Sequence, residues 1–299
     1  MNISQLILQS SLPIREVTPS EVQLIRKIYL DILKDILYIC KKHNLAPMLG
    51  GGSCLGAIRH NGFIPWDDDL DLIMLRKEYD ILPELISKEF GEKYQCVGAN
   101  VSNTPQYPYM KIQRTDCFMQ TIYQSENSYD YLGIDLFPID NIPNCSIQRL
   151  WHGFWLNFIQ YLALCIHFYR ERECYATKLL RSTAEGRKIV NFRLLIGKIT
   201  SIFLKEGNLY EFFDRFAAKY QDKETHRLGI PTGREHYFGE IHPRTVFTHM
   251  TEVDFEGMKA PIPQDYDTYL SVLYGNYMEI PPVDKRERHY IVKIKLPTT

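Results

Sequence analysis

The sequence predicts an α+β protein in which helices accompany a β-sheet, and three stretches support this. From Val22 to Ile39, apolar residues recur at spacings of three and four, the period of an amphipathic helix. Between residues 45 and 142, short apolar runs alternate with turn residues, as strands do. The stretch 146–219 is again mostly helical in pattern, so helices stand on both sides of the strand-rich part of the sequence.

The N-terminal third contains the clearest element boundaries. Thr18-Pro19 combines a capping residue with a proline in the first turn, which predicts a helix start, and Asn44 marks its expected end. Three elements should follow: a strand at 45–49, a short helix at 54–60 after the break at Gly50-Gly51-Gly52-Ser53, and a second strand at 69–75.

The remaining elements follow from the same patterns. Residues 76–90 predict a helix in spite of Pro83. Beyond it we expect short strands at 94–97, 110–113, 118–122 and 133–137, a loop at 229–247, a strand pair at 253–262 and a short helix at 265–274. We expect one domain over 1–299, with 146–219 as a helical insertion or subdomain within it.

The composition excludes several classes of protein. The formal net charge is −1, so no global basic field would attract nucleic acid, and we expect no nucleic-acid partner. The seven cysteines are odd in number and form no C-x-x-C pair, which argues against a disulfide framework or a thiolate zinc site. Residues 1–14 lack the pattern of a signal peptide, so we expect a cytoplasmic protein.

One segment suggests contact with a membrane or a partner. Residues 150–169 contain no Asp, Glu, Lys or Arg, and their length would suffice to span a bilayer. However, Asn157, Gln160 and His167 form a polar stripe at helical spacing. A largely buried helix, or one lying at a membrane surface or against a partner, fits this pattern better than a span. Peripheral association with the inner face of a membrane is therefore one expectation.

The acidic run Asp67-Asp68-Asp69-Leu70-Asp71 is the strongest indication of chemistry. In a strand, residues i and i+2 share a face, so Asp69 and Asp71 should project together while Leu70 faces the core. Adjacent carboxylates repel unless a cation lies between them. Mg²⁺, or Mn²⁺ in its place, prefers such oxygen ligands and commonly serves enzymes that handle phosphates. Asp67 is a further candidate ligand for the metal.

Two other features fit a site that handles phosphates. The Gly51-Gly52-Ser53 turn lies between a strand and a helix start, where backbone N–H groups can approach an anion. Asp135 is flanked by apolar residues, as an acid on a buried strand would be. It could complete a set of metal ligands or act as a base toward an acceptor hydroxyl.

These blocks together resemble the signature of the LicD family. The main block runs from Met48 to Leu75, a second spans 133–140, and a third covers 266–281, with His289 in the trailing segment. The resemblance implies a nucleotidyltransferase-like mixed β-sheet flanked by helices, so that 1–299 would be one catalytic domain. In that superfamily, a Gly-Ser turn precedes an acid-x-acid strand and a third acid stands on a later strand. Here these fall on Gly52-Ser53, Asp69-x-Asp71 and Asp135.

The resemblance also implies a reaction. LicD proteins are phosphotransferases known for moving phosphocholine from CDP-choline to sugar hydroxyls of surface glycans, such as lipopolysaccharide or teichoic acid. We therefore expect a CDP-linked donor, a glycan or lipid-linked glycan as acceptor, and catalysis by Asp69, Asp71 and Asp135 with Mg²⁺.

Several residues are candidate substrate contacts. Gly51, Gly52 and the Ser53 hydroxyl would hold phosphate oxygens, and Arg59 would add a charged contact. Trp66 could stack on a ring, Lys111 could reach a phosphate, and His289 could contact substrate, although each of these residues is also of a type that packs or pairs structurally. A choline head group would need an aromatic cage, for which the tyrosines at 107, 109, 129 and 131 are candidates.

Three alternatives stay open at the level of sequence. An enzyme of the same fold could transfer another phospho-alcohol or a phospho-sugar. It could instead transfer a nucleotidyl group and release pyrophosphate. A catalytically dead glycan-binding protein is the alternative outside enzymology, although the acids Asp69, Asp71 and Asp135 argue against it.

Overall fold

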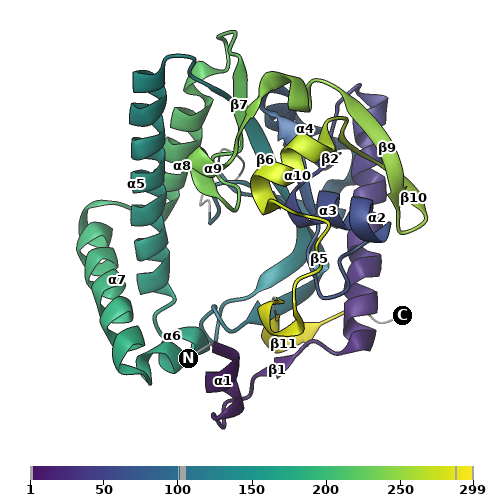
Figure 1. Cartoon of the computed structure of the whole chain (residues 1–299). Coiled ribbons are helices and arrows are strands. Elements are labelled where there is room, and N and C mark those ends of the chain that lie inside the picture. The colour runs from purple at the N-terminus through teal and green to yellow at the C-terminus, as the bar shows by residue number, and fades with distance from the viewer. Residues whose placement is uncertain (1–2, 100, 102–105, 287, 298–299) are drawn as a thin grey trace.

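A mixed β-sheet forms the centre of the computed structural model, which describes residues 3–99, 101, 106–286 and 288–297. Within these residues the main sheet has nine strands, and its central path runs β1-β11-β5-β6-β3-β2. β3 (Asp71–Leu75) and β6 (Asp130–Ile142) pair in parallel, and the other pairings in the described ranges are antiparallel. The α2 helix lies on one side of the sheet and the α5, α7 and α8 helices lie on the other (Figure 1). The expected fold class, a mixed sheet flanked by helices, is confirmed.

The α2 helix (Pro19–Lys42) begins and ends where the sequence predicts. The Thr18 side chain accepts a hydrogen bond from the Glu21 N–H, and the Glu21 carboxylate accepts one from the Thr18 N–H, so both N-terminal donors are satisfied. Asn44 follows the helix in the left-handed conformation at φ 54°, which ends the helical path. The buried side of α2 includes Ile25, Ile32 and Ile36, which belong to the main hydrophobic core.

The segment around the acidic run differs from prediction in its boundaries. The first strand is short, β2 (Met48–Leu49), and α3 (Gly51–His60) begins inside the glycine run rather than at Cys54. β3 begins at Asp71, so Asp69 precedes the strand. The residues before the strand form a turn, which is closed by the hydrogen bond from Asp67 N–H to Ile64 O. The strand begins at Asp71, whose N–H donates to Ser53 Oγ. The α4 helix (Arg76–Phe90) runs as predicted, with Pro83 inside it.

The next strands form a long hairpin. β4 (Tyr94–Val97) has the predicted bounds, while the runs predicted at 110–113 and 118–122 are parts of one strand, β5 (Met110–Thr121). A shift in register between Gln113 and Phe118 explains why one strand gives two separate apolar runs. β6 is longer than the predicted 133–137 and pairs with both β5 and β3.

Helices occupy the stretch from 146 to about 219. They are α5 (Ser146–Arg170), α6 (Tyr175–Arg181), α7 (Ala184–Phe203) and α8 (Glu206–Ala217), followed by the 3-10 turn η2 (Ala218–Tyr220). Leu156 and Ala163 of α5 and Phe213 of α8 share a second hydrophobic cluster with Ile142 of β6. No helix in the described ranges is both long and apolar enough to cross a membrane. Whether 146–219 is an insertion or a subdomain stays a prediction.

The C-terminal part returns to the sheet. The predicted loop at 229–247 contains short elements: β7 (Arg227–Gly229), α9 (His236–Gly239), β8 (Ile241–Pro243) and the 3-10 turn η3 (Arg244–Phe247). The predicted strand pair is β9 (Met250–Phe255) with β10 (Met258–Pro263), and the predicted helix is α10 (Tyr266–Tyr274), capped by Asp265. The sequence did not predict five further elements: α1 (Ile3–Leu8), β1 (Arg15–Glu16), the 3-10 turns η1 (Gly91–Lys93) and η4 (Val283–Lys285), and β11 (Tyr290–Lys295), which pairs with β5.

Candidate active site

The residues predicted to carry chemistry largely converge on one pocket of about 500 Å³. It lies among α3, the paired strands β3 and β6, and the C-terminal elements α9 and α10. Six predicted site residues line it: Gly51, Gly52, Asp67, Asp69, Asp71 and Asp135. The chain therefore brings the glycine turn and the acids of two separate blocks together, as expected.

Asp71 and Asp135 lie side by side because their strands pair in parallel and in register at these two residues. Burial, and then the neighbouring Asp135 and Asp67 carboxylates, raise the pKa of Asp71 well above its usual range. The pKa of Asp69 is raised in the same way, first by burial and next by the Asp71 carboxylate. Without a counter-ion, the pocket therefore favours protonated carboxyl groups, and a cation would relieve the repulsion.

Lys111 supplies one positive charge to this cluster. It stands opposite Asp135 in the pairing of β5 with β6, and its Nζ lies 2.9 Å from Asp135 Oδ1. Burial alone would lower the pKa of Lys111, but Asp135, Tyr107 and Asp130 together outweigh burial, so the pKa is raised and the ammonium group stays charged. Lys111 thus pairs with a predicted catalytic acid, and its contact with a phosphate stays a prediction.

The two glycines let the carboxylates approach the start of α3. A Cβ atom at Gly52 would lie 2.9 Å from Asp67 Oδ2, and one at Gly51 would lie 3.2 Å from Asp71 Oδ2. Gly51 also has a positive φ of 44°, which disfavours any side chain. Its N–H donates to the hydroxyl of Tyr269 at 2.9 Å, so this donor is already used within the protein.

Ser53 is buried and positions Asp71. Its Oγ accepts the hydrogen bond from Asp71 N–H at 2.9 Å, and the residue is not among those lining the pocket. The hydroxyl therefore sets where β3 begins. Contact between the Ser53 hydroxyl and a phosphate stays a prediction.

Arg59 and Trp66 contact the C-terminal segment instead of the pocket. Arg59 donates from Nη1 to Tyr277 O at 2.7 Å and to Glu279 O at 3.2 Å. The guanidinium carbon of Arg286 lies 4.1 Å from the centre of the Trp66 ring, within the range of a cation–π contact. Neither residue is among those lining the 500 Å³ pocket, so both connect the main sequence block to the segment after α10.

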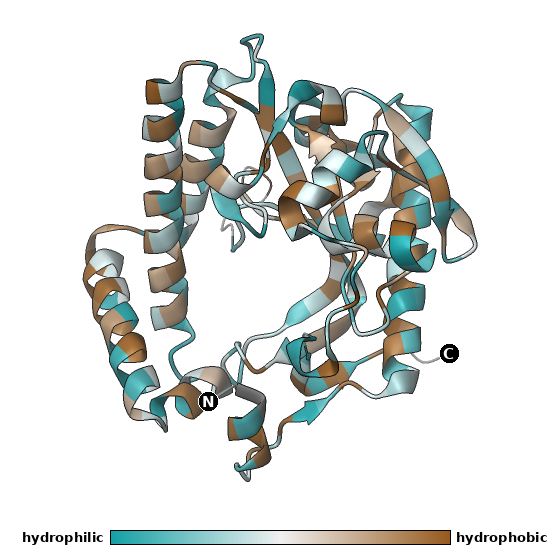
Figure 2. Cartoon of the chain, in the orientation of Figure 1, coloured by the Kyte–Doolittle hydropathy of each residue, from teal (hydrophilic) through white to brown (hydrophobic). Residues whose placement is uncertain are grey.

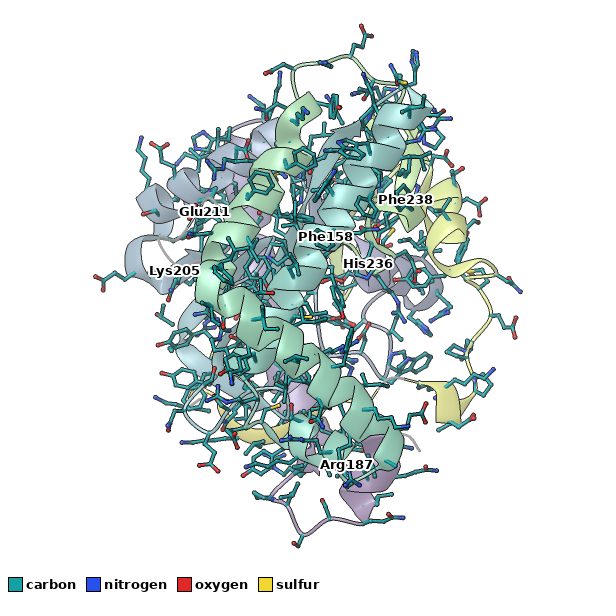
Figure 3. All side chains as sticks on the ribbon, turned by 90° about the vertical axis from the view of Figure 1, so that its left-hand side faces the viewer. Phe158, Arg187, Lys205, Glu211, His236 and Phe238 are labelled. Carbon is teal, nitrogen blue, oxygen red and sulfur yellow. The ribbon has the colours of Figure 1, made fainter. Side chains whose placement is uncertain are left out.

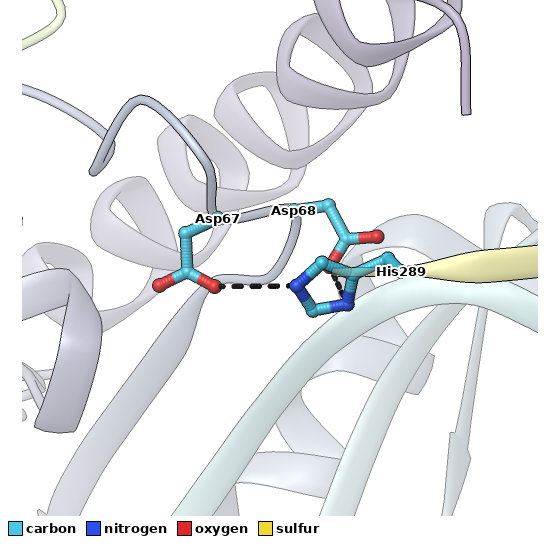
Figure 4. Close-up of side chains that lie close together, drawn as sticks. All are labelled: Asp67, Asp68 and His289. Atoms are coloured by element: carbon cyan, nitrogen blue, oxygen red, sulfur yellow. Dashed lines mark ion pairs between the residues drawn. The ribbon is translucent and has the colours of Figure 1, made fainter. Parts of the chain in front are cut away.

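His289 reaches the acidic run from the residues just before β11. Figure 4 shows its imidazole between two carboxylates, with Nδ1 2.8 Å from Asp68 Oδ1 and Nε2 4.0 Å from Asp67 Oδ1. Among the residues that the structure describes, this is the only His/Cys/Asp/Glu trio whose ligand atoms all lie within 4.8 Å of one another. The predicted trio Asp69, Asp71 and Asp135 lines one pocket without being that tightly gathered.

A second cavity of about 600 Å³ shares two acids with the first. Asp69 and Asp135 line both, and the second cavity continues past Lys111 and Tyr131 to His289. A donor and an acceptor could thus approach the same carboxylates from two directions.

Comparison with known proteins agrees with this arrangement. Residues 44–163 match the profile of the LicD/FKTN/FKRP nucleotidyltransferase domain. Over 278 residues, covering 93% of this chain and 97% of the relative, the sequence is 26% identical to the lipopolysaccharide cholinephosphotransferase LicD of Haemophilus influenzae.

The chain is thus similar to LicD proteins, through the domain at residues 44–163 and along most of its length.

Partial similarity extends to two proteins without an assigned activity. The uncharacterized protein RP689 of Rickettsia prowazekii is 29% identical over 105 residues, which cover 35% of this chain and 37% of that protein. RT0683 of Rickettsia typhi is 24% identical over 109 residues, covering 36% and 33%. The matched family model describes a nucleotidyltransferase domain, and the Haemophilus influenzae relative is named as a cholinephosphotransferase.

No sequence pattern predicted several of the residues that line this pocket. Glu240 is buried and lines the pocket, and burial raises its pKa to about 7 although its carboxylate accepts a hydrogen bond from Glu235 N–H. Arg234 lines the pocket nearby. Both stand in the segment predicted as a loop, where no regular pattern distinguishes a pocket residue. Tyr269 and Tyr274 belong to the third block of the family signature, which was the only indication of their position.

Proposed function

We propose that this LicD-like enzyme transfers phosphocholine from CDP-choline to a sugar hydroxyl of a surface glycan or of its lipid-linked precursor, with Mg²⁺ as its cofactor. Similarity to a protein named lipopolysaccharide cholinephosphotransferase over almost the whole length of both chains is the observation that carries the proposal. The pocket where Asp69, Asp71 and Asp135 meet the start of α3 supports it.

The pocket residues fit a hard divalent cation. The donors are carboxylate oxygens, which Mg²⁺ and Mn²⁺ prefer. Burial first, and then repulsion by the neighbouring carboxylates, raise the pKa values of Asp69 and Asp71, and a bound cation would offset that repulsion. We propose that Asp69 and Asp71 hold the ion, with Asp67 and Asp135 as further ligands. The ion would supply charge neutralisation on the diphosphate and on the departing CMP.

The protein's own groups would then orient the reactants. The N-terminus of α3 lies beside the pocket and favours a phosphate there. Arg234 lines the opposite part and can contact a phosphate oxygen. The sugar hydroxyl would attack the phosphorus that bears choline, the bond from that phosphorus to CMP would break, and Asp135, if not a ligand, would accept the hydroxyl proton. Lys111 Nζ lies 2.9 Å from Asp135 Oδ1 and holds this carboxylate in place for either role.

The head group would lie against aromatic side chains. Tyr109, Phe137 and Tyr274 all line the pocket, and the rings of Tyr109 and Phe137 are 4.5 Å apart between centroids. A quaternary ammonium binds favourably to the faces of such rings. We propose that the enzyme works in the cytoplasm, at the inner face of the membrane, where a lipid-linked acceptor would be presented.

A donor screen tests this function. Purified protein with Mg²⁺ should release CMP from CDP-choline in preference to CDP-ethanolamine or CDP-glycerol, and Asp71→Asn should lower that rate at least about 100-fold. Asp254→Asn, an exposed acid on β9, is the matched control and should keep the wild-type rate. Pyrophosphate released from CTP would instead establish nucleotidyl transfer. Absence of both turnover and ligand binding would favour a catalytically dead glycan-binding protein.

A further inference from the structure

The outer side of the helical region exposes an unusual number of large apolar side chains. On α7, six of them have exposed fractions between 51% and 78%: Ile189, Phe192, Leu195, Ile199, Ile202 and Phe203. On α5, Trp151, Phe154 and Phe158 are exposed as well. Figure 2 shows hydrophobic bands along both helices at the edge of the molecule. Isolated exposed apolar residues are ordinary, but a continuous face of them marks a site of interaction.

The packing of α7 explains why this face remains open. α7 approaches α5 through Gly197, where a Cβ atom would meet Cys165 O at 2.1 Å. Only Val190 and Gly197 are buried on the helix, so most of its apolar residues take no part in the core. α7 therefore packs closely against α5 at Gly197, and the exposed apolar side chains of α7 face away from α5.

The charge around this face is strongly positive. The stretch 174–205 contains seven Lys and Arg residues and one acid, Glu185, a net charge of +6 in a chain whose total is −1. Figure 3 shows Arg187 near one end of α7 and Lys205 at the other, beside the start of α8. Apolar and aromatic residues bordered by cations, with almost no acids, are typical of helices that lie in the headgroup region of an anionic bilayer.

We propose that α7, together with the exposed stripe of α5, forms a docking face that binds the surface of an anionic lipid bilayer. No helix in the described ranges is suited to span a membrane, so the contact is one of a helix lying in the interface. The positive charge favours this occupant over a second copy of the chain, because two such faces would repel each other.

The docking face lies across α5 from the active-site pocket. Gln160 of α5 lines the pocket, whereas Phe154 and Phe158 of the same helix are exposed. Near Gly153, α9 packs against α5, with His236 lining the pocket and Phe238 exposed. Figure 3 labels both residues, seen from the helical side. Docking would thus place the pocket one helix away from the lipid surface. This last step rests on the proposed function, while the docking itself does not.

Vesicle co-sedimentation of the full-length protein tests the docking face. The protein should bind vesicles containing about one-third phosphatidylglycerol and bind pure phosphatidylcholine vesicles at least about tenfold more weakly. Ile199→Glu should lower binding to the anionic vesicles about tenfold or more, because it places a charge in the apolar interface. The matched control is Ile81→Glu on α4, with 48% exposure against 51% for Ile199, and it should bind as the wild type does.

A charge variant and two readouts complete the design. Lys188→Glu with Lys198→Glu should weaken binding to anionic vesicles, while Lys34→Glu on α2 should not. Trp151 should show a blue shift of fluorescence on binding, because its ring enters the interface. Equal binding of wild type and Ile199→Glu would overturn the proposal, as would a dimer in solution that Ile199→Glu dissociates without any vesicle binding. Stabilisation by CDP-choline with Mg²⁺, measured on Ile199→Glu, reports the proposed function separately.

Discussion

Asp71 is held from several directions at once. Ser53 Oγ accepts from its N–H, Asp135 lies beside it on the neighbouring strand, and Gly51 leaves room for its carboxylate at the start of α3. A buried carboxylate surrounded by other acids destabilises the folded chain whenever it is ionised. The ionised Asp71 carboxylate therefore lowers the stability of the folded chain at a position that a cation can occupy.

The first prediction concerns Asp71→Asn in the absence and presence of metal. Without divalent ions near neutral pH, the variant should unfold at a higher temperature than the wild type, because a neutral amide avoids the free-energy cost of keeping the buried Asp71 carboxyl protonated or of burying its charge. Addition of Mg²⁺ should raise the unfolding temperature of the wild type and leave that of the variant almost unchanged. Calorimetry with and without EDTA measures both effects. An equal Mg²⁺ response in the two proteins would contradict the ligand role of Asp71.

The second prediction concerns Glu240. Its pKa is raised by burial from 4.5 to about 7 in the folded state, so the folded protein binds its proton more tightly than the unfolded chain does. The free energy of unfolding should therefore decrease as pH rises from about 4.5 through about 7, by up to about 3 kcal/mol from this group. Glu240→Gln should remove that part of the pH dependence. Urea unfolding between about pH 5 and pH 8 measures it, with the exposed Glu252→Gln as control.

At the scale of elements, one buried cation joins the sheet to the helical region. Arg76, the first residue of α4, donates to Asp140 of β6 from Nε at 2.8 Å and from Nη2 at 2.9 Å, and to Asp214 of α8 from Nη1 at 2.8 Å. All three side chains are buried. Burial raises the pKa of Asp214 to about 6, although the Arg76 guanidinium opposes this effect. Asp140 accepts two hydrogen bonds from Arg76 and Asp214 accepts one, so Asp140 is the better satisfied carboxylate.

The third prediction is that Arg76→Met destabilises the protein by about 3–5 kcal/mol, since it leaves two buried carboxylates without their cation. The loss should be smaller near pH 5, where protonation of the acids becomes possible. Chemical unfolding at the two pH values measures the difference. Lys77→Met, the exposed neighbour, should change stability by less than about 1 kcal/mol. A cost equally small for Arg76→Met would show that the three charges do not hold α4, β6 and α8 together.

The elements themselves were predictable to different degrees. α2 and α10 carry capping residues, and α2 and α4 have long periodic faces. The predicted bounds of all three helices agree with the structure within a few residues. β11 was missed because it is a short segment whose pairing with β1 and β5 depends on distant parts of the chain. Asp69 falls before β3 rather than within it, because the turn at Asp67 is closed by contacts that a strand pattern does not contain.

At the scale of the whole molecule, the C-terminal return completes the site. α10 places Tyr269 against Gly51, the segment after it accepts hydrogen bonds from Arg59, and His289 reaches Asp68. Segments from the N-terminal and C-terminal parts of the sequence therefore both contribute to the site. On its far side, α5 separates it from the exposed apolar face of α7 (Figure 1).

The sequence by itself determined the composition of the acidic cluster and its resemblance to the LicD signature. Asp69, Asp71 and Asp135, with the glycines before them, form a local pattern whose chemistry follows from residue types and spacing. The parallel register of β3 and β6 brings Asp71 and Asp135 together as that pattern implied.

Only the tertiary structure decided which candidates reach the pocket. Ser53, Arg59 and Trp66 stand inside the signature, yet they hold β3 and the C-terminal segment in place. Lys111 pairs with Asp135, and Glu240 enters the pocket from a stretch without pattern. The physical reason is that local spacing sets the direction of a side chain within its own element. The neighbour that this side chain meets depends on how distant elements pack, and a single sequence does not encode that packing as a visible pattern.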